Sequence, residues 1–237
     1  MIQLSLSLII FCCKSNTKHM ARITSSILEG LSGTIGELVI YQVDGKTYSR
    51  KKPGKQSKAT KAKTSPAKRK SQSVIIQTQA FLKNIAHILR FGYQTHTNGA
   101  RRPYHAAVSY TSTNCFKEEG KSKVLDISLV KVSRGSLMGP QDPKAVRVAD
   151  GVEFSWTDNS MHGSARFSDQ AFVVLHSTSG QGSEWVFLGS FRSIEKHKLA
   201  FKNSNSMTQW HAWIAFSQEN PWTKKRTLSD SVYLGIV

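Results

Sequence analysis

Residues 209–218, QWHAWIAFSQ, decide the fold class of this 237-residue chain. Apolar side chains recur at every second position of this stretch, at Trp210, Ala212, Ile214 and Phe216. Successive side chains of a strand point to opposite faces, so this spacing predicts a β-strand with one buried face. Trp213 falls on the opposite face from Trp210. We therefore expect one of these two tryptophans to be exposed.

The residues around this strand have the same β-rich character. Val152, Phe154 and Trp156 alternate in the same way, and Gly, Pro, Asp and Asn residues mark turns between the apolar runs. Seven short strands with such turns predict a β-sandwich over residues 121–237, similar to a fibronectin type III or immunoglobulin-like domain. No cysteine pair supports a true immunoglobulin domain. The expected strands are 124–133, 151–157, 171–177, 185–190, 198–202, 209–218 and 231–237.

A helical connector is expected between residues 73 and 120. Ser73 or a neighbour can cap a helix that runs to about Phe91, and apolar side chains recur at helical spacing along it. Residues 104–115 form either a second short helix or a strand. The fold class is therefore α+β, mainly β. The stripe consists of Val74, Phe81, Leu82, Ile85, Ile88 and Leu89.

Residues 20–50 predict a glycine-rich β-hairpin. Residues 37–43 are β-branched and aromatic, Asp44-Gly45 supplies the two residues of a type I′ turn, and residues 46–50 return. An isolated hairpin is marginally stable in water. We therefore expect it to pack on another part of the fold or on a partner.

The positive charge of the chain is concentrated in one segment. The formal net charge is +18, yet residues 45–117 hold sixteen Lys or Arg and no acidic residue. Residues 51–72, a basic low-complexity arm, hold too few apolar side chains to fold alone, so we expect disorder in the free chain. The arm is either a contact for a polyanion or a solvated linker. The candidate nucleic-acid-binding residues are Lys46, Arg50, Lys51, Lys52, Lys55, Lys58, Lys61, Lys63, Lys68, Arg69, Lys70, Arg101 and Arg102.

A second candidate contact lies in a predicted hairpin loop near the C-terminus. Trp222 follows Pro221 there and precedes three cations, Lys224, Lys225 and Arg226. An exposed aromatic ring beside cations suits a nucleic acid, a glycan or a protein surface. The alternative is a loop that packs on its own domain.

The first nineteen residues allow several interpretations. The apolar run at residues 4–13 is too short to span a bilayer, and no cation precedes it as in a secretory signal. Translation from Met20 is the simplest explanation; a secretory or lipoprotein signal and a buried strand are the alternatives. The expected location is cytoplasmic, with an exported lipoprotein or a virion as alternatives.

No catalytic site is predicted. The histidines are scattered, Cys12, Cys13 and Cys115 form no ligand set, and no metal or cofactor is expected. The glycines at 30, 33 and 36 lack the Gly-Lys-Ser/Thr ending of a phosphate-binding loop. These features favour a non-enzymatic binding protein.

Several short blocks in order resemble a family. They are Met-Ala-Arg-Ile at 20–23, Gly-Leu-Ser-Gly-Thr-Ile-Gly at 30–36, Ser-Arg-Gly-Ser-Leu at 133–137, Phe-Ser-Trp-Thr-Asp at 154–158 and Tyr-Leu-Gly at 233–235. From Met20 onward the chain is similar to a domain-of-unknown-function family from Bacteroidota. This resemblance implies no activity. The hairpin also resembles that of small phage-encoded proteins.

Two functions are compatible with the sequence. The first is an RNA- or DNA-associated protein, with the ribosome as a natural partner, in which the arm contacts phosphates. The second is a structural or adhesion module of a virion or cell surface, in which the sandwich binds a protein partner. The sequence leaves the oligomeric state open.

Overall fold

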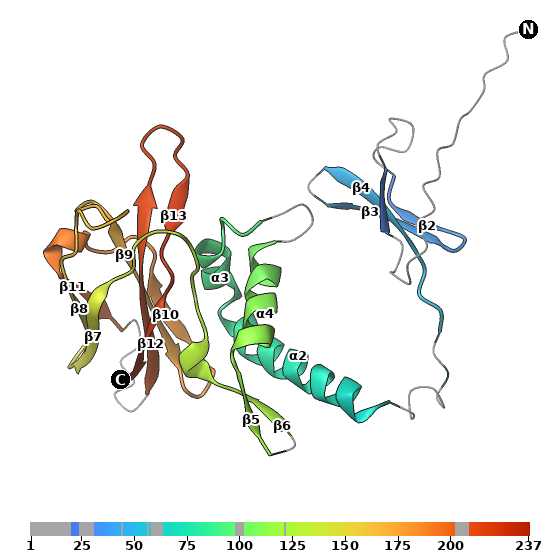
Figure 1. The fold of residues 1–237 in the computed structure, drawn as a ribbon, viewed down its shortest axis with the longest axis horizontal. Helices are drawn as coiled ribbons and strands as arrows, with labels where there is room; N and C mark the ends of the chain where they lie inside the picture. Colours follow the sequence, from blue (N-terminus) through green and yellow to red (C-terminus); the bar gives the residue numbers. More distant parts are fainter. Residues whose placement is uncertain are drawn as a thin grey trace, which may run out of the picture. The chain divides into compact units, whose positions relative to one another are not determined.

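A computed structural model describes residues 20–23, 31–43, 45–55, 57, 64–97, 102–120, 122–201 and 209–237. The chain divides into two compact units, Met1–Lys61 and Ala62–Val237, and each unit is described by itself. Antiparallel strands dominate both units (Figure 1), which confirms a mainly β protein of the α+β class. Among the described residues, no helix is long and apolar enough to cross a membrane.

The N-terminal unit is built around the predicted hairpin. Strands β3 (Leu38–Val43) and β4 (Lys46–Lys51) pair antiparallel, and Gly45 has the positive φ of 71° that a tight turn requires. Asp44 lies outside the described residues. Strands β1 (Met20–Ile23) and β2 (Gly33–Ile35) extend the hairpin to a four-stranded sheet in the order β1-β4-β3-β2. The hairpin is thus stabilised by two further strands.

Three helices begin the C-terminal unit: α2 (Pro66–Asn84), α3 (Ala86–Gly92) and α4 (Pro103–Asn114). The predicted start near Ser73 was wrong. Ser65 caps α2 by accepting a hydrogen bond from the Lys68 backbone N–H at 3.3 Å, and Pro66 occupies the first turn, where its missing N–H costs nothing. The last residues of the predicted arm are therefore helical. Residues 104–115, which the sequence left undecided, lie almost entirely in α4.

Two larger sheets follow the helices. The first has the order β10-β9-β12-β13, with β14 also paired to β12; the second has the order β11-β8-β7. A small hairpin of β5 (Phe116–Glu119) and β6 (Ser122–Leu125) and the 3-10 turns η2 (Ile127–Leu129) and η3 (Arg192–Ile194) complete the unit. The strands of the two larger sheets are β7 (Gln141–Val148), β8 (Gly151–Thr157), β9 (Gln170–Ser177), β10 (Ser183–Val186), β11 (Lys196–Ala200), β12 (Trp210–Glu219), β13 (Arg226–Leu228) and β14 (Val232–Ile236).

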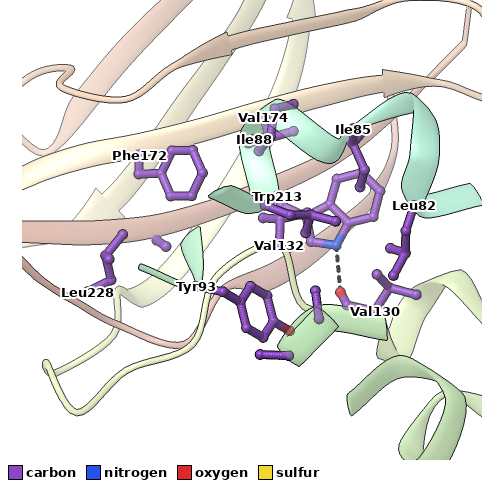
Figure 2. Packing of buried hydrophobic residues seen from close by; sticks show 14 of the residues in the cluster. Leu82, Ile85, Ile88, Tyr93, Val130, Val132, Phe172, Val174, Trp213 and Leu228 are labelled. Carbon is purple, nitrogen blue, oxygen red and sulfur yellow. Dashed lines mark hydrogen bonds between the residues drawn. The ribbon is translucent and has the colours of Figure 1, made fainter. Parts of the chain in front are cut away.

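The five-stranded sheet is buried on both faces. Trp210, at 8% exposure, packs with Phe154 and Trp156 of the three-stranded sheet. Trp213, at 0% exposure, packs on the other face with residues of α2 and α3, and its indole N–H donates to the Val130 carbonyl at 2.9 Å (Figure 2). The expectation that one of these tryptophans is exposed was wrong, because helices cover the face that the sequence left open (Figure 1).

Two predicted strands differ clearly from the observed ones, and two observed strands were not predicted. Residues 124–133 are not one strand, because β6 ends at Leu125 and η2 follows. Strand β10 begins at Ser183 and ends at Val186, earlier than expected. Strands β7 and β13 were not predicted; β7 is an edge strand with a register shift between Gln141 and Lys144, where Pro143 is tolerated.

A buried ion pair lies where the strands of the two sheets end. Arg192 and Asp169 are both 0% exposed, and the Arg192 Nε donates to the Asp169 Oδ2 at 3.1 Å. Further guanidinium protons reach the carbonyls of Gly139 at 3.1 Å and Met138 at 2.8 Å. The guanidinium also lies 3.8 Å from the ring centroid of Phe216. Protein groups thus compensate the buried charge of each side chain, as burial requires.

Candidate nucleic-acid interface

One face of the N-terminal sheet gathers aromatic and basic side chains. The register pairs Arg22 with Tyr48, and Tyr48 with Tyr41, in one row across β1, β4 and β3. Lys46 and Arg50 lie two residues from Tyr48 on β4, one to each side. Directly paired residues, and residues two apart on one strand, share a face. We call these five residues the tyrosine face.

The two tyrosine rings are stacked. Their centroids are 5.9 Å apart with 23° between the ring planes, and the Arg50 guanidinium lies 5.8 Å from the centroid of Tyr41. Both rings are half-buried, whereas Arg22, Lys46 and Arg50 are exposed. The face therefore presents flat apolar surfaces surrounded by cations.

The predicted arm continues directly from β4. Lys51, Lys52 and Lys55 are exposed, and the Lys51 ammonium lies 3.0 Å from a carboxylate oxygen of Glu37. Both partners of that pair are largely exposed, so it contributes little and can open to another anion. The candidates Lys58, Lys61 and Lys63 lie outside the described residues.

The last three cations of the arm lie in the first turns of α2. Lys68 and Arg69 are exposed, and the ammonium of Lys70 donates to Glu118 at 2.8 Å. This hydrogen bond, with the charge of Lys70, lowers the pKa of Glu118. The first turn has no acidic residue, so these cations add to the positive end of the helix dipole. This arrangement favours anions at the start of α2.

The other candidate cations occupy separate places. Arg101 lies outside the described residues, and Arg102 is exposed at the cap position of α4. Trp222 is 90% exposed in the turn between β12 and β13, where its backbone N–H donates to the Asn220 side chain at 2.9 Å. Lys224 and Lys225 are exposed, but Arg226 lies in β13 and pairs with Glu219. The charge of Arg226 is therefore largely neutralised.

The reactive side chains of the C-terminal unit are mostly buried. Burial raises the pKa of Cys115 to about 11, and its thiol donates to the Leu129 carbonyl at 3.1 Å, so the group is protonated at neutral pH. His176 and His211 are paired across β9 and β12, and burial lowers the pKa of both. Within the described ranges, no three His, Cys, Asp or Glu side chains gather as they would around a metal ion.

Comparison with known proteins identifies the family. The model of a family of unknown function, DUF6266, matches residues 30–235. The chain belongs to the DUF6266 family. This confirms the expected resemblance to a domain-of-unknown-function family, while an origin in Bacteroidota stays a prediction. No curated protein and no solved structure matched the chain.

The DUF6266 match includes the residues that the sequence interpretation overlooked. Tyr41 and Tyr48 lie inside it, and the sequence interpretation assigned neither to a binding site. The signal was available: a two-residue turn at Asp44-Gly45 fixes the register, and that register places Tyr41 opposite Tyr48. Arg22 could not be placed, because its pairing with Tyr48 depends on how β1 joins the sheet.

Proposed function

We propose that this DUF6266 protein is a non-enzymatic, cytoplasmic protein that binds RNA or DNA through the cations between Lys46 and Lys70, with the ribosome as one candidate partner. The observation that carries the proposal is eleven Lys or Arg in this segment without one acidic residue. The described members that are exposed are Lys46, Arg50, Lys51, Lys52, Lys55, Lys68 and Arg69.

Charge alone explains how such a segment would bind. Each cation that neutralises a phosphate releases a condensed counterion, so affinity falls steeply as salt rises. Contacts of this kind position the nucleic acid but do not read its bases. The expected binding is therefore tight at low salt and largely independent of sequence.

The decisive experiment separates local charge from total charge. An arm variant carries Lys52→Gln, Lys55→Gln, Lys58→Gln, Lys61→Gln and Lys63→Gln, all upstream of the Ser65 cap, so α2 keeps its start. A spread variant loses the same total charge at exposed positions of the C-terminal unit, through Lys83→Gln, Arg90→Gln, Lys144→Gln, Arg166→Gln and Lys196→Gln. Affinity for a single-stranded oligonucleotide is measured as a function of salt concentration.

The two variants have different expected outcomes. In the arm variant, the slope of log affinity against log salt becomes shallower by up to about 0.7 for each lysine that contacts a phosphate. In the spread variant, the slope stays near that of the native chain. Equal losses in both variants would mean that only net charge matters, and the proposal would fail.

The alternative, a structural or adhesion module, is supported by two observations in the C-terminal unit. The strands alternate between sheets in the order β7-β8-β11 and β10-β9-β12-β13, which is compatible with a fibronectin type III-like sandwich. Trp222 is a large exposed aromatic residue in a turn at one end of it. Sedimentation of a lysate with and without nuclease distinguishes the two functions, because only a nucleic-acid-bound protein changes fraction.

A further inference from the structure

We infer that the tyrosine face is a stacking platform for unpaired bases, which makes single-stranded nucleic acid the preferred ligand. This inference rests on the proposed function, since the arm supplies the contacts to phosphate. It adds a second kind of contact, made by Tyr41 and Tyr48 to the bases themselves. Aromatic side chains on sheets bind every base type in this way, because each base has a π-face.

The tyrosines lie on the opposite face of the sheet from its two most buried residues. Ile40 and Thr47, which alternate with Tyr41 and Tyr48 along β3 and β4, are 7% and 1% exposed. Because neighbours along a strand point to opposite faces, Ile40 and Thr47 lie on the face opposite the tyrosines. The two half-buried rings are stacked on each other, on the face that also carries the exposed side chains of Arg22, Lys46 and Arg50.

Charge on this face matches a nucleic acid. Arg22 is paired with Tyr48, Arg50 approaches the Tyr41 ring, and Lys46 is the first residue of the strand that carries Arg50. The described strand residues on this face include no carboxylate, so a backbone phosphate meets only cations there. These residues are Arg22, Thr34, Val39, Tyr41, Val43, Lys46, Tyr48 and Arg50.

Chain continuity links the face to the arm. Arg50 lies at the end of the tyrosine face, and Lys52 and Lys55 follow within a few residues after β4 ends. A nucleic-acid strand whose phosphates follow the arm is therefore held close to the rings. A duplex cannot use them, because its bases are already stacked on one another. The platform thus adds affinity for a single strand and none for a duplex.

The experiment uses the full chain and three probes of equal phosphate number. They are an oligothymidine of about 24 nucleotides, longer than known single-strand sites, the same strand with abasic residues, and a duplex of about 12 base pairs. The native chain is compared with the double variant Tyr41→Leu/Tyr48→Leu and with Tyr41→Phe/Tyr48→Phe, which keeps both rings. Circular dichroism and thermal unfolding check that each variant is folded.

The native chain is expected to bind oligothymidine roughly 5- to 150-fold tighter than the abasic strand, the range for one stacked base. The leucine variant loses that preference but keeps its affinity for the abasic strand, whereas the phenylalanine variant keeps both. If the double variant does not fold, the single variants Tyr41→Leu and Tyr48→Leu replace it, and a folded leucine variant that keeps the preference overturns the inference. Equal affinity of the native chain for the abasic strand and oligothymidine overturns the inference, and so does equal affinity for the duplex.

The failure of this inference is distinguishable from the failure of the proposed function. If only the platform idea is wrong, the native chain binds all three probes alike, and the arm variant still weakens every one. If the proposed function is wrong, none of the probes binds in a salt-dependent way. A second copy of the chain on this face would instead give a concentration-dependent dimer that the leucine variant dissolves, and that result would also overturn the inference.

Discussion

The five-stranded sheet and the four-stranded sheet use their faces in opposite ways. The five-stranded sheet of the C-terminal unit buries both faces, so Trp210 and Trp213 contribute to two separate cores. The four-stranded N-terminal sheet exposes most of its side chains and carries Arg22, Lys46 and Arg50 around a tyrosine pair. The two large hydrophobic cores therefore lie in the C-terminal unit, whereas the proposed binding contact lies on the N-terminal sheet.

The largest expected effect on stability is at the buried ion pair. Arg192→Met leaves Asp169 charged and buried without its main partner, which costs about 3–5 kcal/mol of unfolding free energy. Urea unfolding measures the loss. The control is Lys198→Met, which removes a half-exposed partner of Asp150 and costs about 1 kcal/mol or less. Similar losses at the two sites would contradict a structural role for the buried pair.

A smaller loss is expected where α3 meets the segment after η2. A Cβ atom at Gly92 would lie 1.9 Å from the Val132 carbonyl oxygen, so Gly92→Ala forces the backbone apart. Overpacking of this kind costs about 1–3 kcal/mol. Gly139→Ala, where a Cβ atom meets nothing within 4 Å, is the matched control. A melting temperature unchanged by Gly92→Ala would show that this contact is looser than described.

A pH dependence follows from His176 and His211, which lie side by side under the helices. Burial lowers the pKa of each below the ordinary value of 6.5, so the unfolded chain takes up protons first as pH falls. The free energy of unfolding is therefore at its full value above pH 6.5 and decreases below it. The decrease is at most about 1.4 kcal/mol per pH unit for each proton that the unfolded chain takes up. Urea unfolding between pH 8 and pH 5 measures it.

The histidine prediction has a direct control. His176→Gln keeps a polar side chain near Ser183, which the native imidazole contacts at 2.8 Å, but it does not titrate. The variant should therefore show a flatter dependence of stability on pH. A native protein that becomes more stable toward pH 5 would contradict the assigned direction of the pKa shifts.

The smallest effect is expected at Trp222. Because this side chain is 90% exposed, Trp222→Ala should change the free energy of unfolding by no more than about 0.5 kcal/mol. Under the proposed function, it should also leave the affinity for single-stranded nucleic acid unchanged. A marked loss of affinity, measured by fluorescence anisotropy of a labelled strand, would move the binding site to the C-terminal unit.

Local patterns predicted much of the fold. The alternation in residues 151–157 and 209–218 gave strands β8 and β12 almost to the residue, and the turn at Asp44-Gly45 predicted the hairpin. Alternation could not reveal that both faces of β12 are covered, because the covering helices lie more than a hundred residues earlier. The pairing of Arg192 with Asp169 likewise depends on tertiary packing and has no local signal.

The candidate site was only partly predictable. The cations of the arm could be found from composition alone, because counting charged residues does not depend on how the strands pair. It could not show that the arm ends at a helix, since the Ser65 cap and Pro66 lie within a lysine-rich stretch that otherwise indicates disorder. The tyrosine face required the pairing of β1 with β4, which the sequence did not predict.

Hydrogen–deuterium exchange with and without a single-stranded oligonucleotide tests the central claim most directly, because it maps the contact along the whole chain. The proposed function predicts slower exchange in peptides covering residues 38–57 and no change in peptides that contain Trp222. Protection confined to the turn between β12 and β13, with residues 38–57 unchanged, would contradict it.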